Sequence, residues 1–141
     1  MMHRNKKEND LNRDKWIGVG GKFLLGESPE ECLLREVHEE TGLTLNRYTL
    51  RGILTFVSDA CPETEYIYLY TSDSYSGEIL KNCREGELEW IEKSELKKLA
   101  LWEGDKIFLS LLDSTREFFS LKLVYSGEKL ASAVLNGDRI I

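Results

Sequence analysis

One helix with strong signals at both ends constrains the fold more than any other part of the chain. Ser28 is a typical N-cap, Pro29 suits the first helical position, and Glu31 stands at the spacing of a capping box. Gly42 is typical of the residue at which a helix ends. The sequence therefore predicts a helix that begins at Pro29 and stops before Gly42.

Three glutamates of this helix share one face. Glu36, Glu39 and Glu40 stand at positions i, i+3 and i+4, while Leu33 and Val37 supply an apolar side. The glutamates crowd the last turn, where the helix dipole disfavours negative charge, so they are poorly placed unless a cation binds. Carboxylate oxygens suit Mg²⁺ or Mn²⁺, with substrate phosphates completing the coordination. Taken alone, such a triplet is more often a solvated acidic face. The glycines, Glu27 and Arg35 that surround it favour a metal site here.

The same glutamates belong to a longer pattern. With x for any residue, it runs Gly21-x5-Glu27-x7-Arg35-Glu36-Val37-x-Glu39-Glu40-x-Gly42-Leu43. This pattern resembles the Nudix box, the signature of hydrolases that act on a nucleoside diphosphate linked to another moiety. The resemblance implies that the three helix glutamates hold metal, that the Gly20 carbonyl adds a ligand, and that Glu27 and Arg35 orient the ligands. By spacing, Arg35 can pair with Glu39, or with Glu27 if the preceding loop folds back.

Composition excludes several classes of function. The chain has 141 residues, enough for one domain with a real core, which we expect over residues 1–141. A net charge of −6 and a pI near 5.1 argue against a surface for nucleic-acid polymers. We find neither a membrane span nor a signal peptide. The 3 cysteines lack metal-type spacing, which favours reduced thiols in a cytoplasmic protein.

Local patterns predict a mixture of strands and helices. The predicted strands cover residues 16–19, 50–57, 65–71, 87–91, 118–125 and 129–135. Two further helices are expected, at residues 94–100 with Ser94 as cap and at residues 105–115. This mixture favours an α/β (α+β) fold. The resemblance implies a Nudix-type α/β/α sandwich with a mixed sheet and the box as loop–helix–loop. Residues 1–4 match the end of the first strand of the family, so we expect either that the start of that strand is mis-assigned or trimmed here or that the strand is short in this protein.

Two acids outside the box are candidates for the same metal site. In MutT-type enzymes a glutamate from a Glu-Gly turn approaches the metals, and Glu85 stands before Gly86. The resemblance therefore implies Glu85 as a ligand, with Glu87 as the substitute and a solvated turn acid as the alternative. Glu39, Glu40 or Glu85 would accept the proton of the attacking water, and the residues leave that choice open.

The chain also resembles the animal oxidised-purine nucleoside triphosphatases over residues 101–105 and over the hairpin predicted at residues 118–135, which turns around Ser126 and Gly127. There a Trp and an Asp contact the base, so the resemblance implies stacking on Trp102 and a hydrogen bond to Asp105. Core packing is the alternative for Trp102. Ile17 stands where those enzymes carry a base-contacting Asn, which argues against a sharp preference for 8-oxo-guanine. Lys22, beside Gly21, either meets a phosphate or is a solvated turn residue.

These residues together predict an enzyme. We expect metal-dependent hydrolysis of a nucleoside triphosphate to the monophosphate and pyrophosphate, sanitising oxidised purine dNTPs such as 8-oxo-dGTP. The alternatives are another nucleotide, namely an undamaged dNTP or ADP-ribose, or a nucleotide-sensing module without turnover. The expected partner is a nucleotide carried with Mg²⁺, with Mn²⁺ as the other candidate metal, and neither a nucleic-acid polymer nor a membrane. The oligomeric state is left open.

Overall fold

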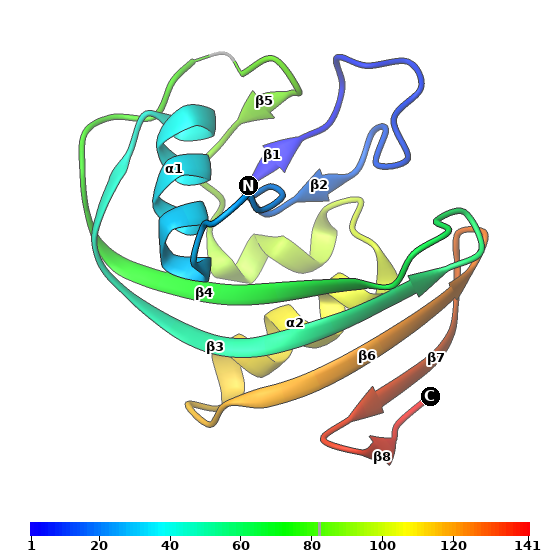
Figure 1. Ribbon diagram of the computed structural model, residues 1–141. Coiled ribbons are helices and arrows are strands. Elements are labelled where there is room, and N and C mark those ends of the chain that lie inside the picture. Colours follow the sequence, from blue (N-terminus) through cyan, green and yellow to red (C-terminus); the bar gives the residue numbers. More distant parts are fainter. Residues whose placement is uncertain (82) are drawn as a thin grey trace. The chain divides into compact units, whose positions relative to one another are not determined.

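The strands form two sheets in the computed structural model, which describes residues 1–81 and 83–141. One sheet has three strands in the order β2-β1-β5, and the other has five in the order β4-β3-β6-β7-β8 (Figure 1). The residues gather into two units, Met1–Tyr48 with Ser72–Leu101 and Thr49–Thr71 with Trp102–Ile141. The fold class is mixed α+β, as the sequence predicted. Within the described part of the chain, every helix is too short or too polar to cross a membrane.

The three-stranded sheet is built from very short strands. Strand β1 (Met2–His3) lies between β2 (Trp16–Ile17) and β5 (Glu87–Leu88) and pairs with both in antiparallel fashion (Figure 1). Strand β1 has 2 residues, and both of its edges are paired. Gly86 lets the chain pass closely, because a Cβ there would lie 2.0 Å from the His3 carbonyl oxygen.

Helix α1 (Pro29–Thr41) follows the predicted capping signals. The Glu31 amide donates to Ser28 Oγ at 3.1 Å, and the Ser28 amide donates to the Glu31 carboxylate at 2.8 Å. At the other end Gly42 takes a left-handed φ of 78°, and its amide donates to the His38 carbonyl. The expected loop–helix–loop is confirmed, and the helix buries three side chains, those of Cys32, Val37 and Thr41.

The five-stranded sheet is mixed, as expected. Strand β6 (Phe119–Ser126) pairs in parallel with β3 (Thr44–Ser58) and in antiparallel fashion with β7 (Lys129–Leu135). Alternate residues of β6 are buried, so one face of the strand contributes to an apolar core. Helix α2 (Glu103–Ser114) packs on this core through the side chains of Ile107, Phe108, Leu111 and Leu112.

Several predicted boundaries were wrong. Strands β3 and β4 (Glu65–Ser76) run well beyond the predicted residues 50–57 and 65–71. Their polar ends are held by side chains across the strands, since Asn46 bonds to Ser76 at 2.9 Å. Apolar periodicity marks only the buried portion of a strand, so it misses such ends.

The second predicted helix and the end of the chain also differ from expectation. Lys93–Lys98 forms a 3₁₀ helix, η1, that follows Glu92 instead of an α-helix capped by Ser94. Strand β5 stops at Leu88, and the unpredicted strand β8 (Asp138–Arg139) pairs with β7. These elements are too short for a periodic signal to accumulate in the sequence.

Candidate functional site

Arg35 lies at the centre of a network of carboxylates. Its Nη2 donates to Glu27 at 2.9 Å and its Nε contacts the same carboxylate, while Nη1 donates to Glu36 at 2.5 Å and to Glu39 at 3.2 Å. Both pairings that the spacing allowed are thus present together. The hydrogen bonds from Arg35 lower the pKa of Glu27 to about 2, so this carboxylate is ionised at neutral pH.

The Glu27 carboxylate also fastens the loop before α1. It accepts the Leu24 amide at 2.7 Å, and the Glu27 amide returns a bond to the Leu24 carbonyl at 3.1 Å. Gly26, with φ 81°, closes the turn between them. Arg35 adds a bond to the Lys22 carbonyl at 3.1 Å. Glu27 and Arg35 therefore join loop and helix, an arrangement suited to orienting neighbouring carboxylates.

Gly21 makes room for the carboxylate of Glu36. A Cβ at residue 21 would lie 2.3 to 2.5 Å from the three carboxyl atoms of Glu36, well inside contact distance. The Glu36 side chain is 16% exposed, so the carboxylate is held between Gly21 and the Arg35 guanidinium. The chain thus places a charged oxygen pair against the backbone of the glycine turn.

Glu40 lies on the other side of the same turn. Its carboxylate accepts the Gly20 amide at 2.9 Å. Partial burial raises its pKa to about 7, and the negative charges of Glu85 and Glu36 act in the same direction. The structure therefore brings Glu36, Glu40 and Glu85 close enough for their charges to interact. The Gly20 contact made here is through the amide, and the predicted carbonyl ligand stays a prediction.

Glu85 is held by a residue that sequence reasoning missed. Arg4 Nη1 contacts the Glu85 carboxylate at 2.5 Å, and Arg4 Nε contacts Asp10 at 2.6 Å. Arg4 and Asp10 lie in the polar segment 4–15, for which the sequence indicates a loop and no functional residue. No periodic or spacing signal links them, because the pairing depends on how the loop folds back along β1.

The donor set fits a hard divalent cation. The Glu40 carboxylate interacts electrostatically with those of Glu36 and Glu85, and Glu39, its neighbour on α1, is 59% exposed. Among the described residues, no group of three or more His, Cys, Asp or Glu side chains is arranged around one point as metal ligands. The chemistry of the donors thus suits Mg²⁺, and the predicted convergence of Glu36, Glu39 and Glu40 stays a prediction.

The predicted base-contacting residues belong to the other unit, apart from Ile17 in β2. The half-buried Trp102 precedes α2, and its ring meets the edge of Tyr125 with centroids 5.5 Å apart. The Gly104 amide donates to the Tyr125 hydroxyl at 2.7 Å. Burial raises the pKa of Asp105, in the first turn, to about 7. Trp102 therefore packs on the core of its own unit and is partly buried there.

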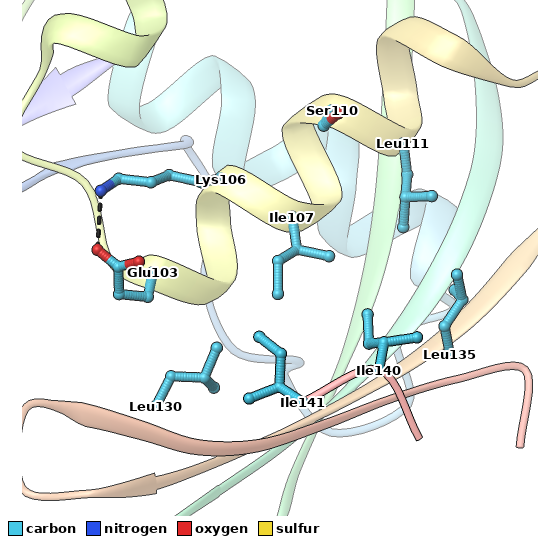
Figure 2. Close-up of a pocket in the computed structure, with 9 residues that line it drawn as sticks. All are labelled: Glu103, Lys106, Ile107, Ser110, Leu111, Leu130, Leu135, Ile140 and Ile141. Atoms are coloured by element: carbon cyan, nitrogen blue, oxygen red, sulfur yellow. Dashed lines mark hydrogen bonds and ion pairs between the residues drawn. The ribbon is translucent and has the colours of Figure 1, made fainter. Parts of the chain in front are cut away.

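This unit also has an apolar hollow of about 420 Å³. Figure 2 shows side chains of α2 facing β7 and the last residues of the chain across it. Its lining is mostly aliphatic, with Glu103 and Lys106 paired at 2.8 Å. Such a lining provides few polar groups to bind phosphates or to activate water, so the candidate active site is the carboxylate network of the first unit.

Several known proteins are similar to this chain in sequence. Residues 1–112 match the model of the NUDIX domain. An uncharacterized Nudix hydrolase from Bacillus subtilis, YvcI, is 30% identical over 103 residues, which cover 71% of this chain and 65% of that protein. The oxidized purine nucleoside triphosphate hydrolase of Danio rerio is 29% identical over 114 residues, covering 79% of this chain and 71% of that protein.

A solved structure is also similar. The crystal structure of the mutator MutT protein from Bacillus halodurans superposes with a TM-score of 0.81 at 30% sequence identity. The match covers 86% of this chain and 82% of that one. The matched region of the B. subtilis relative is just under two thirds of its length.

Proposed function

Because the chain belongs to the Nudix hydrolase family, we propose that it hydrolyses a nucleoside triphosphate to the monophosphate and pyrophosphate with the help of a divalent metal. The observation that carries this proposal is the network around Arg35, in which Glu27, Glu36 and Glu39 share one guanidinium beside the glycine turn. The D. rerio relative is an oxidized purine nucleoside triphosphate hydrolase, which supports an oxidised purine dNTP, such as 8-oxo-dGTP, as the substrate.

In this mechanism Glu36, Glu39 and Glu40 would hold the metal, with Glu85 as a further ligand. A bound Mg²⁺ supplies charge for the phosphates and lowers the pKa of an attacking water. Arg35 keeps the carboxylates of α1 in place, since it contacts two of them directly. Glu39, Glu40 or Glu85 takes up the proton that the water releases. The water attacks the α- or β-phosphorus of the triphosphate, the P–O bond that links these two phosphates breaks, and nucleoside monophosphate and pyrophosphate are released.

We further propose that Trp102 and Asp105 contact the purine. Trp102 is only partly buried, and an indole ring is able to stack on a base. With a pKa of about 7, the Asp105 carboxyl is populated near neutral pH both as a donor and as an acceptor, so it suits the mixed edge of a purine. Ile17 has no polar side-chain group, which favours a broad preference among purines over strict selection of 8-oxo-guanine.

The box also fits other nucleotides. Its carboxylates take part in hydrolysis of the diphosphate, whereas residues outside the box determine which group attached to the diphosphate is accepted. ADP-ribose and undamaged dNTPs are therefore the competing substrates. A sensing module without turnover is the competing class of function. The chain retains all four box glutamates, Glu27, Glu36, Glu39 and Glu40, which favours an enzyme over a sensor.

A nucleotide panel tests the proposal. The purified protein is incubated with Mg²⁺ and with 8-oxo-dGTP, dGTP, dATP or ADP-ribose in turn, and kcat/KM is measured together with the products. We expect triphosphates to give monophosphate and pyrophosphate, 8-oxo-dGTP to rank with the best of them, and EDTA to abolish turnover. A preference for ADP-ribose would reassign the substrate, and binding without turnover of any nucleotide would favour the sensor.

A further inference from the structure

Arg4 occupies an enclosed position between two carboxylates. Its side chain is 14% exposed, and Nε and Nη1 contact Asp10 and Glu85 at 2.6 and 2.5 Å. Asp10 is 6% exposed and Glu85 is 32% exposed. A guanidinium is planar and directs its N–H groups in fixed directions, so it can bridge two carboxylates and fix the angle between them.

Asp10 is itself fixed independently of Arg4. Its second oxygen accepts the Asn12 amide at 3.0 Å, and its carbonyl accepts the Arg13 amide at 3.0 Å. The loop is closed by the Asp14 amide, which donates to the Arg4 carbonyl at 2.8 Å. Asp10 therefore serves as an anchor from which the direction of the guanidinium is set.

The backbone around Glu85 is also fixed, which leaves its side chain as the variable part. The Cys83 amide donates to the Gly86 carbonyl at 3.3 Å, and Gly86 lies against β1. Besides Arg4, the Glu85 carboxylate has Lys7 Nζ at 3.7 Å, on a side chain that is 55% exposed. An exposed lysine at that distance restrains a carboxylate weakly. The direction of the Glu85 carboxylate thus depends mainly on Arg4.

We propose that Arg4 is a positioning residue that, anchored by Asp10, holds the Glu85 carboxylate beside Glu40 for use by the bound metal. The inference rests on the proposed function, because it assigns a metal to that end of α1. Bridging requires the fork of a guanidinium, and the single ammonium of a lysine cannot reproduce it. A charge role alone would tolerate lysine, whereas a bridging role would not.

The charge-conserving variant Arg4→Lys tests this directly. Mn²⁺ binding is measured by EPR on the full chain, and kcat and KM are measured with the best nucleotide of the panel. Arg13→Lys is the matched control, since Arg13 lies in the same loop, 57% exposed, and contacts only Asp14 among the ion pairs described. We expect Arg4→Lys to lower Mn²⁺ affinity and kcat by about 10-fold or more, with KM and the fold by circular dichroism retained, and Arg13→Lys to change neither by more than about 2-fold.

Two more variants separate positioning from other roles. If Arg4 acts through Glu85, the double variant Arg4→Lys/Glu85→Gln should stay within about 3-fold of Glu85→Gln alone, because the second change removes nothing further. Asp10→Asn, which weakens the anchor and keeps Arg4, should shift Mn²⁺ affinity in the same direction by less. Multiplicative losses in the double variant, or wild-type Mn²⁺ affinity in Arg4→Lys, would overturn the inference. If the Mn²⁺ affinities of the wild type and the variants follow these expectations but the wild type hydrolyses no nucleotide, the proposed function alone is overturned.

Discussion

The stability of this protein should depend on pH through Asp105. Burial at the start of α2 raises the pKa of its carboxyl from the ordinary 3.8 to about 7, and the Tyr125 hydroxyl interacts electrostatically with it. The folded state therefore binds the proton more tightly than the unfolded state. The stability gained from that proton is complete below pH 4 and is lost as the pH rises through 7.

The magnitude follows from the two pKa values. A difference of about 3 pKa units at 1.36 kcal/mol each sets a ceiling of about 4 kcal/mol for the cost of the ionised carboxylate. Between pH 5 and pH 8.5 the change is about 2–3 kcal/mol at most, since part of the cost is already present at pH 5. Asparagine has a similar shape and carries no charge. Asp105→Asn should therefore stabilise the protein relative to wild type, and more at pH 8.5 than at pH 5.

Urea unfolding followed by circular dichroism, at half-unit steps between pH 5 and pH 8.5, measures the difference. The control is Asp113→Asn, an exposed carboxylate on the same helix, for which we expect no pH-dependent difference beyond about 0.5 kcal/mol. If the difference between Asp105→Asn and wild type is the same at every pH, Asp105 does not titrate near neutrality. If the variant is less stable at pH 8.5, a hydrogen bond to the carboxylate outweighs its burial.

Three further predictions concern the site. Gly21→Ala should push away the Glu36 carboxylate, which is the flexible end of a side chain. We therefore expect the free energy of unfolding in urea to stay within about 1 kcal/mol of wild type and kcat to fall at least ~10-fold. The control is Gly18→Ala, because a Cβ at residue 18 would meet open space. Glu39→Gln should lower kcat by ~100-fold with the fold intact, whereas near-normal turnover would remove Glu39 from the mechanism. Trp102→Ala should weaken kcat/KM by ~1–3 kcal/mol without changing Mn²⁺ affinity, and a loss of stability without that effect would favour core packing.

The sequence predicted the parts of the fold that depend on neighbouring residues. The capping residues Ser28, Glu31 and Gly42 bound α1 correctly, because a cap is formed by groups within one turn of each other. The β6–β7 hairpin around Ser126 and Gly127 was predicted for the same reason. Strand ends were not, since cross-strand contacts such as that of Asn46 decide them.

The part of the site that could not be predicted from the sequence depends on contacts between residues far apart in the chain. Arg4 and Glu85 are separated by 81 positions, and no pattern in either segment indicates their pairing. Arg51 is similar: it falls in an apolar strand, yet its guanidinium reaches the carbonyl of Leu112 at 3.2 Å near the end of α2. A buried arginine is expected only where a partner exists, and the partner becomes visible only in the fold.

The distribution of positive charge around the box shows how an acidic cluster can be both folded and reactive. Arg35 contacts the carboxylates of α1 and of the preceding loop, and Arg4 contacts Glu85. Glu40 instead receives the neutral amide of Gly20, and its burial beside other acids opposes its ionisation. The guanidinium groups thus neutralise the carboxylates that shape the site, and the carboxylate left with a neutral partner is the one for which a divalent cation would relieve the most repulsion. Under the proposed function, we therefore expect Glu40 to be the carboxylate toward which a divalent cation is most strongly drawn.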